Sequence, residues 1–404
     1  MKKLCLIFVV LFLVAQGCTQ ESKVKYNYIP PENNIDGLEV STLLELGLDS
    51  IPIVELVDEI YKGRLTEVHS ILILKDNKLV FEEYFHGHKY KWNGHYHHGD
   101  WVKWNYKMQH SLQSVTKSIT SLCIGIAIDQ GKIESIHQSI FDYLPDYQYL
   151  KKNGRENITI EHLVTMTSGL EWDEWGAPLS SKKNDIVGLW FPNSENIISK
   201  ILERPIISKP GTEFTYSGGN MILLGEILKN ATNLPIDEFS KRYLFEPLGI
   251  ENSEWTLRFD DGTIESAGGL KLTSRDMAKI GITYLNGGVW KGKKIISEDW
   301  VEKCADHYNY NTWYNTFLLT KPPGASSIGG RNGYSYGWWT YSFSTPISKR
   351  IDIYYAGGWG GQNIIVIPKL NTIVVFTGGN YTSKTQQFTI LKQYILPAYY
   401  TNLI

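Results

Sequence analysis

Hydrophobic and polar positions near the beginning of the 404-residue chain predict a helix followed by a β-hairpin. Residues 43–63, LLELGLDSIPIVELVDEIYKG, carry apolar side chains at helical spacing. In residues 69–87, HSILILKDNKLVFEEYFHG, two apolar or alternating runs flank the turn-forming sequence KDNK. We therefore expect ordered structure to begin in this part of the chain.

The segment that begins at Ser114 predicts a buried helix, and Gly131 is a typical residue to end it. Its apolar residues recur at helical intervals: Ile119, Leu122, Cys123, Ile126 and Ala127. From there to about residue 255 the chain contains short helical patterns separated by Pro and Gly. The middle of the chain is therefore predicted to be mostly helical.

The last third of the chain returns to strand patterns. Short β-branched and aromatic runs such as YSYGWWTYSF, RIDIYYAGG, QNIIVIPK and NTIVVFTGG are bounded by Gly, Asn or Pro, and a helical pattern, TQQFTILKQYILPAYY, follows them. Strands at both ends and helices between them predict an α+β fold. Residues 37–110 and 256–404 would form the sheet domain, and residues 111–255 an inserted, mostly helical domain.

The N-terminus, MKKLCLIFVVLFLVAQGCTQ, predicts an export signal over residues 1–18. Its apolar run is shorter than the ~20 residues needed to span a bilayer. The ending AQGC resembles a bacterial lipoprotein signal, so we expect lipidation of Cys18 in the cell envelope. Ala15 is a less usual residue than Leu in that motif, and ordinary signal-peptidase cleavage stays the alternative. Residues 19–36 are polar and contain a double proline, which predicts a tether.

Composition restricts the class of protein. The chain is 42% hydrophobic and 20% charged, which is typical of a globular protein. Its formal net charge of -2 gives no reason to expect a nucleic-acid partner. We expect a small-molecule or peptide-like substrate, and membrane contact only through the N-terminal anchor. The 13 Trp and 25 Tyr residues fit either an aromatic cleft or ordinary core packing.

The sequence SVTK at residues 114–117 suggests chemistry. Residues three apart share a helix face, so Ser114 and Lys117 would stand side by side in the first turn. A serine hydroxyl needs a base, and a lysine can serve if its pKa is lowered. The positive end of the helix dipole would favour that lowering. Alone, however, this pattern occurs by chance in many chains.

Five longer segments carry a family resemblance, in the order HSLQSVTKSITSLCIGIAIDQGKI, ITIEHLVTMTSGLEW, PGTEFTYSGGNMILLGEILKNATN, SAGGLKLTSRDMAKIGITYLNGG and YAGGWGGQNIIVIPKLNTIVVFTGG. They resemble the serine β-lactamase and penicillin-binding-protein superfamily, closest to its class C-like branch of esterases, D-aminopeptidases and 6-aminohexanoate-oligomer hydrolases. The likeness runs from about residue 65 to the C-terminus. It implies a β-lactamase-like fold, with an antiparallel sheet flanked by helices and an inserted helical domain.

The resemblance implies roles for particular residues. Ser114 would be the acylated nucleophile, Lys117 its proton acceptor, and Tyr216 an acid or base for the leaving group. Backbone N–H groups of Ser114 and Gly358 would form the oxyanion hole. No cofactor is implied, and no metal.

Two departures from the family motifs argue against efficient β-lactam hydrolysis. The usual asparagine two residues after the tyrosine is replaced by Gly218, with Asn220 displaced. The sheet-edge motif, normally Lys-Thr-Gly or His-x-Gly, has Tyr355, Ala356 and Gly357, so a cation for a substrate carboxylate is missing.

We expect the substrate to contact aromatic and polar side chains on two segments. Trp172, followed by Asp173, Glu174 and Trp175, lies in a loop that rims the cleft in this family. Trp338, Trp339 and Trp359 flank the edge strand. The predicted substrate-binding residues are Trp172, Asn220, Tyr355 and Trp359. Large aromatics in strands mostly pack, so a core role stays equally open.

A histidine-rich segment, HGHKYKWNGHYHHGD, contains His86, His88, His95, His97 and His98. A metal site is one interpretation. The segment contains no H-E-x-x-H and resembles a loop after the hairpin, in which alternate histidines need not converge. We therefore predict no metal ion and regard His110 as structural.

The preferred interpretation is an exported serine hydrolase that cleaves an amide or ester through an acyl-enzyme on Ser114. The alternative is a catalytically silent, penicillin-binding-protein-like binding protein of the cell envelope, and a metallohydrolase comes third. The sequence does not name the substrate, because one fold hosts many specificities.

Overall fold

The computed structural model describes residues 26–191, 196–306, 332–345, 348–383 and 386–400. The predicted export signal, with Cys18, lies outside these residues, so the signal and its lipidation stay predictions. Among the described residues, no helix is both long and apolar enough to cross a bilayer.

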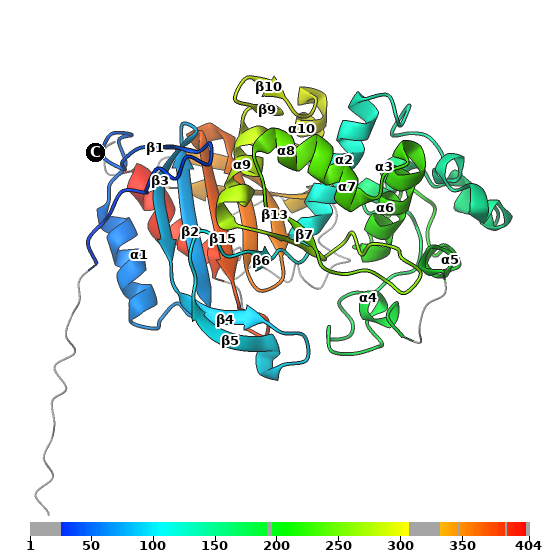
Figure 1. Ribbon diagram of the computed structural model, residues 1–404, viewed down its shortest axis with the longest axis horizontal. Coiled ribbons are helices and arrows are strands. Elements are labelled where there is room, and N and C mark those ends of the chain that lie inside the picture. The colour runs from blue at the N-terminus through cyan, green and yellow to red at the C-terminus, as the bar shows by residue number, and fades with distance from the viewer. Residues whose placement is uncertain (1–25, 192–195, 307–331, 346–347, 384–385, 401–404) are drawn as a thin grey trace, which may run out of the picture.

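One eight-stranded sheet built from both ends of the chain dominates the structure (Figure 1). The spatial order of its strands is β1-β3-β2-β15-β14-β13-β12-β11. The pair β1 and β3 is parallel and all other neighbours are antiparallel. The strands are β1 Glu39–Val40, β2 Val68–Lys75, β3 Lys78–Tyr84, β11 Asn332–Ser335, β12 Trp338–Thr345, β13 Ser348–Gly358, β14 Gln362–Ile367 and β15 Thr372–Gly378.

The predicted hairpin is confirmed as β2 and β3. Its two turn residues, Asp76 and Asn77, have φ values of 51° and 63°. Positive φ at both positions is what a two-residue turn needs in order to match the right-handed twist of the flanking strands. Successive side chains of β2 point to opposite faces: Leu72 and Leu74 enter one core, whereas Ile71 and Ile73 enter the other. The middle of β2, residues 71–74, is entirely apolar because both faces of the strand are buried there.

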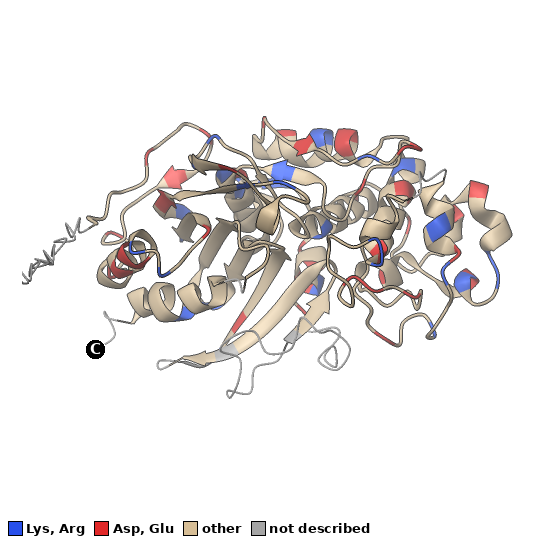
Figure 2. Ribbon diagram, turned by 90° about the horizontal axis from the view of Figure 1, so that it is seen from below, with Lys and Arg blue, Asp and Glu red and all other residues tan. Residues whose placement is uncertain are grey.

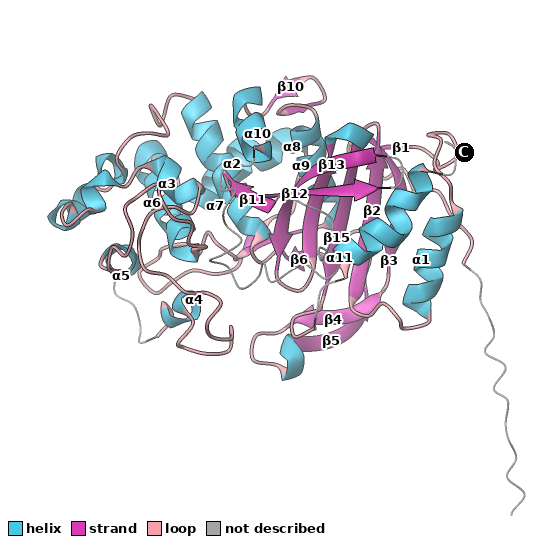
Figure 3. Cartoon of the chain, turned by 180° about the vertical axis from the view of Figure 1, so that it is seen from behind, coloured by secondary structure: helices cyan, strands magenta, loops and turns pink. Residues whose placement is uncertain are grey.

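Helices cover both faces of the sheet (Figure 3). On one face lie α1 Ile51–Tyr61 and the C-terminal helical segments Gln387–Ile390, Leu391–Ile395 and Leu396–Tyr399. On the other lie α2 Val115–Asp129 and α9 Ser274–Leu285, with α10 Glu298–Ala305. Beyond α2 are α3 Ile160–Val164, α4 Asp185–Gly188, α5 Ile197–Leu202, α6 Gly218–Thr232, α7 Ile236–Ser240 and α8 Glu246–Leu248. This arrangement confirms the predicted sheet flanked by helices.

The histidine-rich segment is a second hairpin, so the expectation of a loop was wrong. Strand β4 His86–Tyr90 pairs with β5 His98–Lys103 at the lower edge of the sheet in Figure 1. Polar side chains on both strands hide the alternation by which a strand is usually recognised. Smaller ladders join β6 His110–Ser111, β7 Glu254–Trp255 and β8 Leu270–Leu272, and β9 Val289–Trp290 with β10 Lys293–Lys294.

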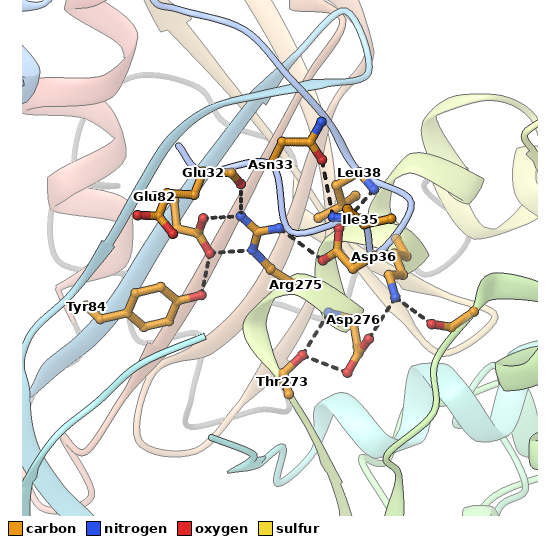
Figure 4. Close-up of polar contacts among 12 residues, drawn as sticks. Glu32, Asn33, Ile35, Asp36, Leu38, Glu82, Tyr84, Thr273, Arg275 and Asp276 are labelled. Carbon is orange, nitrogen blue, oxygen red and sulfur yellow. Dashed lines mark hydrogen bonds and ion pairs between the residues drawn. The ribbon is translucent and has the colours of Figure 1, made fainter. Parts of the chain in front are cut away.

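Residues 26–36, which the sequence assigned to a tether, lie against the sheet domain. Arg275 at the start of α9 is 2% exposed and holds this segment (Figure 4). Its guanidinium pairs with Asp36 at 3.0 Å and Glu82 at 2.5 Å, and donates to the Glu32 carbonyl oxygen at 2.8 Å. A buried arginine is stable only when its donors are satisfied, so this contact fixes the segment to the fold.

Charged residues are interspersed over the helices and loops, whereas the long strands are mostly uncharged (Figure 2). This distribution agrees with the small net charge of -2. Buried charges also occur near the first turn of α2, where Lys117 lies 3.9 Å from Glu174.

Candidate active site

The first turn of α2 places Ser114 and Lys117 side by side. Ser114 occupies the N-cap position without a capping hydrogen bond from its side chain, and Lys117 follows one turn later with 3% of its surface exposed. The Lys117 Nζ atom lies 3.1 Å from Ser114 Oγ and donates to the Ala267 carbonyl oxygen, also at 3.1 Å. Gln113 has a φ of 51°, which is uncommon for a residue with a side chain and is a form of strain that often accompanies functional sites.

Tyr216 joins these two side chains from the loop that leads into α6. Ser217 caps α6 and accepts a hydrogen bond from the Asn220 N–H at 3.2 Å, which fixes the direction of the loop. The Tyr216 ring is 4% exposed, and Lys117 Nζ lies 4.8 Å from the centroid of that ring. The structure thus brings together all three residues to which the resemblance assigns catalysis.

Two buried carboxylates complete the cluster. Glu174 Oε2 lies 3.9 Å from Lys117 Nζ, and Glu174 Oε1 accepts hydrogen bonds from the Gly218 N–H and from Trp172 Nε1. Glu265 accepts the N–H of Ala267 at 3.0 Å, the same residue whose carbonyl oxygen binds Lys117. The two glutamates are 6% and 3% exposed. Lys117 therefore sits in an acidic pocket, not in an apolar one.

The electrostatics follow from burial and from these charges. Burial alone would lower the pKa of Lys117, but Tyr216, Glu174 and Glu265 raise it, and the net shift is upward. Burial raises the pKa of Tyr216, although the Lys117 charge opposes the shift. Burial likewise raises the pKa of Glu265 to about 7 against the effect of Lys117. At neutral pH the resting site therefore contains a charged lysine beside a neutral phenol.

The sequence-based expectation of a lowered pKa for Lys117 was wrong in direction. It considered the helix dipole and burial, but not the two carboxylates, which come from distant loops. Glu174 was interpreted only as part of a cleft rim, and Glu265 was missed. Its position directly before the segment SAGGLKLT was the one available signal.

Aromatic rings line the cluster around Tyr216. The centroid of its ring lies 5.3 Å from that of Trp175, 5.5 Å from Trp339 and 6.0 Å from Tyr334. Trp172, predicted to bind substrate, is 6% exposed and donates its indole N–H to Glu174 at 2.8 Å. Trp172 thus positions a carboxylate, and the rings that reach Tyr216 are those of Trp175, Trp339 and Tyr334.

Asn220, also predicted to bind substrate, is not brought to the cluster. It is fully buried, accepts a hydrogen bond from Ser168 Oγ at 2.9 Å and contacts the Met166 sulfur. A Cβ atom on Gly218 would lie 2.6 Å from Glu174 Oε1. Glu174 therefore occupies the space beside the position at which the family motif usually has asparagine.

Strand β13, predicted as an edge strand, lies between β12 and β14, and its last residue, Gly358, reaches the nucleophile beyond the residues that pair with β12. A Cβ atom there would lie 2.3 Å from the Leu112 carbonyl oxygen and 3.3 Å from the Gln113 Cβ. Only glycine allows this close approach to the residues that precede Ser114. The resemblance's assignment of Gly358 to an oxyanion hole stays a prediction, and its location beside this segment fits it.

The two remaining predicted substrate residues lie on or just after β13. The half-buried Tyr355 packs edge-on against Phe388, with ring centroids 5.0 Å apart, toward the C-terminal helical segments. Trp359 is also half-buried, and its indole N–H donates to the Tyr381 carbonyl oxygen at 2.7 Å. Its ring centroid is 6.0 Å from that of Tyr90 on β4, so the second hairpin lies next to this edge of the sheet.

The histidines converge more than the sequence indicated. Glu67, His88 and His98 each offer one ligand atom, and these atoms lie within 4.8 Å of one another. The assumption that these histidines do not converge was therefore wrong for two of the five. Among the described residues, this is the group whose atoms could hold a metal ion.

Comparison with known proteins gives consistent results. The Beta-lactamase family matches residues 57–387. The 6-aminohexanoate-dimer hydrolase of Paenarthrobacter ureafaciens is 24% identical over 272 residues, which are 66% of this chain and 65% of that protein. A Salmonella agona protein named D-alanyl-D-alanine carboxypeptidase is 23% identical over 188 residues, which are 46% of this chain and 42% of that protein. The matches span less than two thirds of either relative.

A solved structure extends the comparison to the fold. A Bacillus anthracis protein named 6-aminohexanoate-dimer hydrolase superposes with a TM-score of 0.62 at 18% identity, covering 94% of this chain and 88% of that one. At this identity the superposition shows a shared fold. It confirms the fold class that the sequence resemblance implied.

Proposed function

Because the chain belongs to the Beta-lactamase family, we propose that it is a serine hydrolase that cleaves an amide or ester bond through an acyl-enzyme on Ser114. The observation that carries the proposal is the 3.1 Å contact between Lys117 Nζ and Ser114 Oγ, with the Tyr216 ring beside Lys117. A hydroxyl becomes a strong nucleophile only when a neighbouring group accepts its proton.

The proposed reaction has two halves. In the first, Ser114 Oγ attacks the substrate carbonyl carbon while its proton passes to the Lys117 and Tyr216 pair, which then protonates the leaving amine or alcohol. In the second, a water molecule attacks the acyl carbon, its proton returns through the same pair, and Ser114 is released with the carboxylic acid. Backbone N–H groups of Ser114 and Gly358 would bind both oxyanions.

The acidic pocket adds a condition to this scheme. Since Glu174 and Glu265 favour the protonated form of Lys117, the pair must first lose a proton to solvent before it can accept one from Ser114. We therefore expect activity to rise with pH on the alkaline side of neutrality, because the pKa of Lys117 is shifted upward. The Glu265 carboxyl, whose pKa is raised to about 7, ionises at lower pH, before the pair loses its proton.

We propose an uncharged, extended amide or ester as substrate and inefficient hydrolysis of β-lactams. Tyr355, Ala356 and Gly357 occupy the motif that would supply a cation for a β-lactam carboxylate. Aromatic rings of Trp175, Trp339 and Tyr334 surround Tyr216 and suit an uncharged chain. The relatives are named for a 6-aminohexanoate dimer and for D-alanyl-D-alanine, which supports cleavage of an amide bond.

Hydrolysis of p-nitrophenyl acetate and butyrate tests the proposal. The purified protein should turn over both esters, whereas Ser114→Ala and Lys117→Ala should not. Lys132→Ala changes an exposed lysine beyond the opposite end of α2 and should match the wild type. Absence of ester turnover in the wild type would favour the silent binding protein, and efficient nitrocefin turnover would refute the proposed substrate class.

The proposed reaction uses no cofactor. Addition of EDTA should therefore leave ester hydrolysis in place, whereas a metallohydrolase would lose it. A chelator effect of more than about 10³-fold would move the chemistry from Ser114 to a bound metal, because metal activation of water is worth several kcal/mol.

We also propose that the protein is exported and anchored to the cell envelope through Cys18. The support is the sequence alone: two lysines, an apolar run and the ending AQGC. Metabolic labelling with palmitate should mark the wild-type chain and not Cys18→Ser. No label on either chain would leave ordinary signal-peptidase cleavage as the better account, and equal labelling of both would place the acyl chain on a residue other than Cys18.

A further inference from the structure

A second cluster of polar side chains lies away from Ser114. Glu67 directly precedes β2, His88 lies on β4, and His98 begins β5. One ligand atom from each lies within 4.8 Å of the other two. The three residues are half-buried, so the cluster is neither a solvated surface patch nor part of a sealed core.

The backbone is shaped to bring these residues together. Glu67 has a φ of 53°, an uncommon value for a residue with a side chain. A Cβ atom on Gly87 would lie 2.3 Å from the His69 ring, and one on Gly379 would lie 2.5 Å from Glu67 Oε2. Two glycines therefore let the hairpin and the end of β15 approach the Glu67 carboxylate more closely than other residues would allow.

Hydrogen bonds fix one oxygen of the Glu67 carboxylate, and the other oxygen faces the ring of His88. Glu67 Oε2 accepts the His88 backbone N–H at 3.0 Å and lies 3.2 Å from Nε2 of the buried His69. Glu67 Oε1 lies 2.7 Å from His88 Nδ1. Oε2 is thus fixed by the protein, and Oε1 shares a single proton with an imidazole nitrogen.

The third residue is oriented in the manner of a metal ligand. His98 Nε2 donates to the Gly379 carbonyl oxygen at 2.9 Å, so its proton is on Nε2 and Nδ1 has a free lone pair. Metal-binding histidines usually donate their second ring N–H to a carbonyl or carboxylate oxygen. The His88 and His98 rings lie face to face, 4.2 Å apart with a 4° angle between their planes.

We propose that Glu67, His88 and His98 bind one divalent transition-metal ion, with Zn²⁺ as the best match. Two imidazoles and one carboxylate suit Zn²⁺, whereas Mg²⁺ and Ca²⁺ prefer oxygen ligands. Bonds of ~2.1 Å in tetrahedral geometry separate ligand atoms by roughly 3.4 Å, so modest side-chain rotations would close the cluster. The ion replaces the proton between His88 Nδ1 and Glu67, that proton leaves to solvent, and water fills the fourth position.

The bound ion would fasten the second hairpin to the sheet beside the proposed active site. Tyr90 and His97, from the same hairpin, have ring centroids 6.0 Å and 4.8 Å from that of Trp359, which follows Gly358. The role is structural: the ion supports one wall of the site and contacts no reacting group. The proposal does not depend on Ser114 chemistry.

Titration calorimetry with the metal ions alone tests the site. Untagged protein, freed of metal with EDTA and then of EDTA, should bind one Zn²⁺ per chain and no Mg²⁺ at the same concentration. His88→Ala and His98→Ala should weaken Zn²⁺ binding at least ~100-fold, the scale on which metal-site substitutions act. His86→Ala, an exposed histidine on the same strand that stacks on Trp101, is the matched control.

Equal weakening by His86→Ala, or no saturable binding at one equivalent, would overturn the proposal. Glu67→Gln, a change without loss of volume, and far-ultraviolet circular dichroism guard against a misfolded variant. Co²⁺ gives a separate readout, since bound tetrahedral Co²⁺ absorbs visible light strongly. The wild type should show these bands and Glu67→Gln should lose them; bands that persist in this variant would also contradict the site.

Discussion

The two polar clusters beside the sheet are built in different ways. Ser114 and Lys117 stand one turn apart on a single helix, so their spacing along the chain already places them in contact. Glu67 directly precedes β2, His88 lies within β4 and His98 begins β5, and only the pairing of β4 with β5 and their approach to β2 bring them together. Function carried by one helix turn can be read from a motif, whereas function that depends on strand convergence needs the fold.

The clusters also differ in what surrounds their charges. Lys117 is almost fully buried together with Tyr216, Glu174 and Glu265, so each charge acts strongly on the others. The Glu67 cluster is half-buried and accessible to ions from solvent. We therefore expect substitutions to change chemistry in the first cluster and stability in the second.

The largest expected effect comes from the Ser114 cluster. Ser114→Ala and Lys117→Ala should each lower kcat/KM for p-nitrophenyl butyrate at least ~10³-fold, because nucleophile and base act as a unit. Thermal melting should change little for Ser114→Ala, which removes a single oxygen atom. Lys117→Ala removes a buried cation beside two carboxylates, so circular dichroism must show that this variant is folded before its activity is compared. Similar residual activity in Ser114→Ala and wild type would show that the chemistry lies elsewhere.

The next-largest effect concerns Gly358, the last residue of β13, which lies beside the residues that precede Ser114. Gly358→Ala places a methyl group against the Leu112 carbonyl oxygen and should lower kcat about 100-fold, the order expected for one disrupted oxyanion donor. Gly357→Ala is the control, because its Cβ would meet only side-chain atoms at 3.2 Å or more. If both variants lost activity equally, a special role for Gly358 would be wrong.

A smaller effect tests the acidic pocket. Glu265 raises the pKa of Lys117, so Glu265→Gln should lower that pKa and move the rising limb of the kcat/KM pH profile to lower pH. Each pH unit by which the limb moves corresponds to about 1.4 kcal/mol of interaction between the Glu265 charge and Lys117. The glutamine can still accept the Ala267 N–H, which preserves the local geometry. A limb that stays in place or moves to higher pH would contradict the assigned electrostatics.

The last expected effect is on stability and not on catalysis, and it concerns the second cluster. Zn²⁺ at 100 times its dissociation constant should stabilise the wild type by about 2.7 kcal/mol and raise its melting temperature. His98→Ala should lose this increase, whereas His95→Ala, which changes an exposed histidine of the same hairpin, should keep it. An equal increase in all three proteins would point to nonspecific binding.

Much of the fold was predictable because its elements have simple patterns. The KDNK turn, the apolar β2 strand and the helix from Ser114 each follow a local rule, and the structure confirms them. Strand β4 was missed because its histidines and lysines do not alternate with apolar residues. Local patterns identify a strand when its residues form an apolar run, as in β2, or alternate between apolar and polar, and β4 does neither.

The candidate site was predictable where its residues lie in family motifs, and not where their surroundings depend on tertiary packing. Motif matches located Ser114, Lys117 and Tyr216, which the structure brings together. They did not indicate that Trp172 and Asn220 are buried and hydrogen-bonded to neighbouring residues of the protein, since the burial of a side chain depends on tertiary packing. The direction of the Lys117 pKa shift was also beyond reach, because Glu265 is 148 positions away along the chain.

Peptide mapping after reaction with a fluorophosphonate probe tests the central claim most directly. The probe forms a stable phosphorus–oxygen bond with an activated serine hydroxyl and releases fluoride. Mass spectrometry then identifies the modified residue. The account predicts one adduct per chain, on Ser114, and no adduct in Lys117→Ala. An unlabelled wild-type protein, or an adduct on another residue, would contradict it.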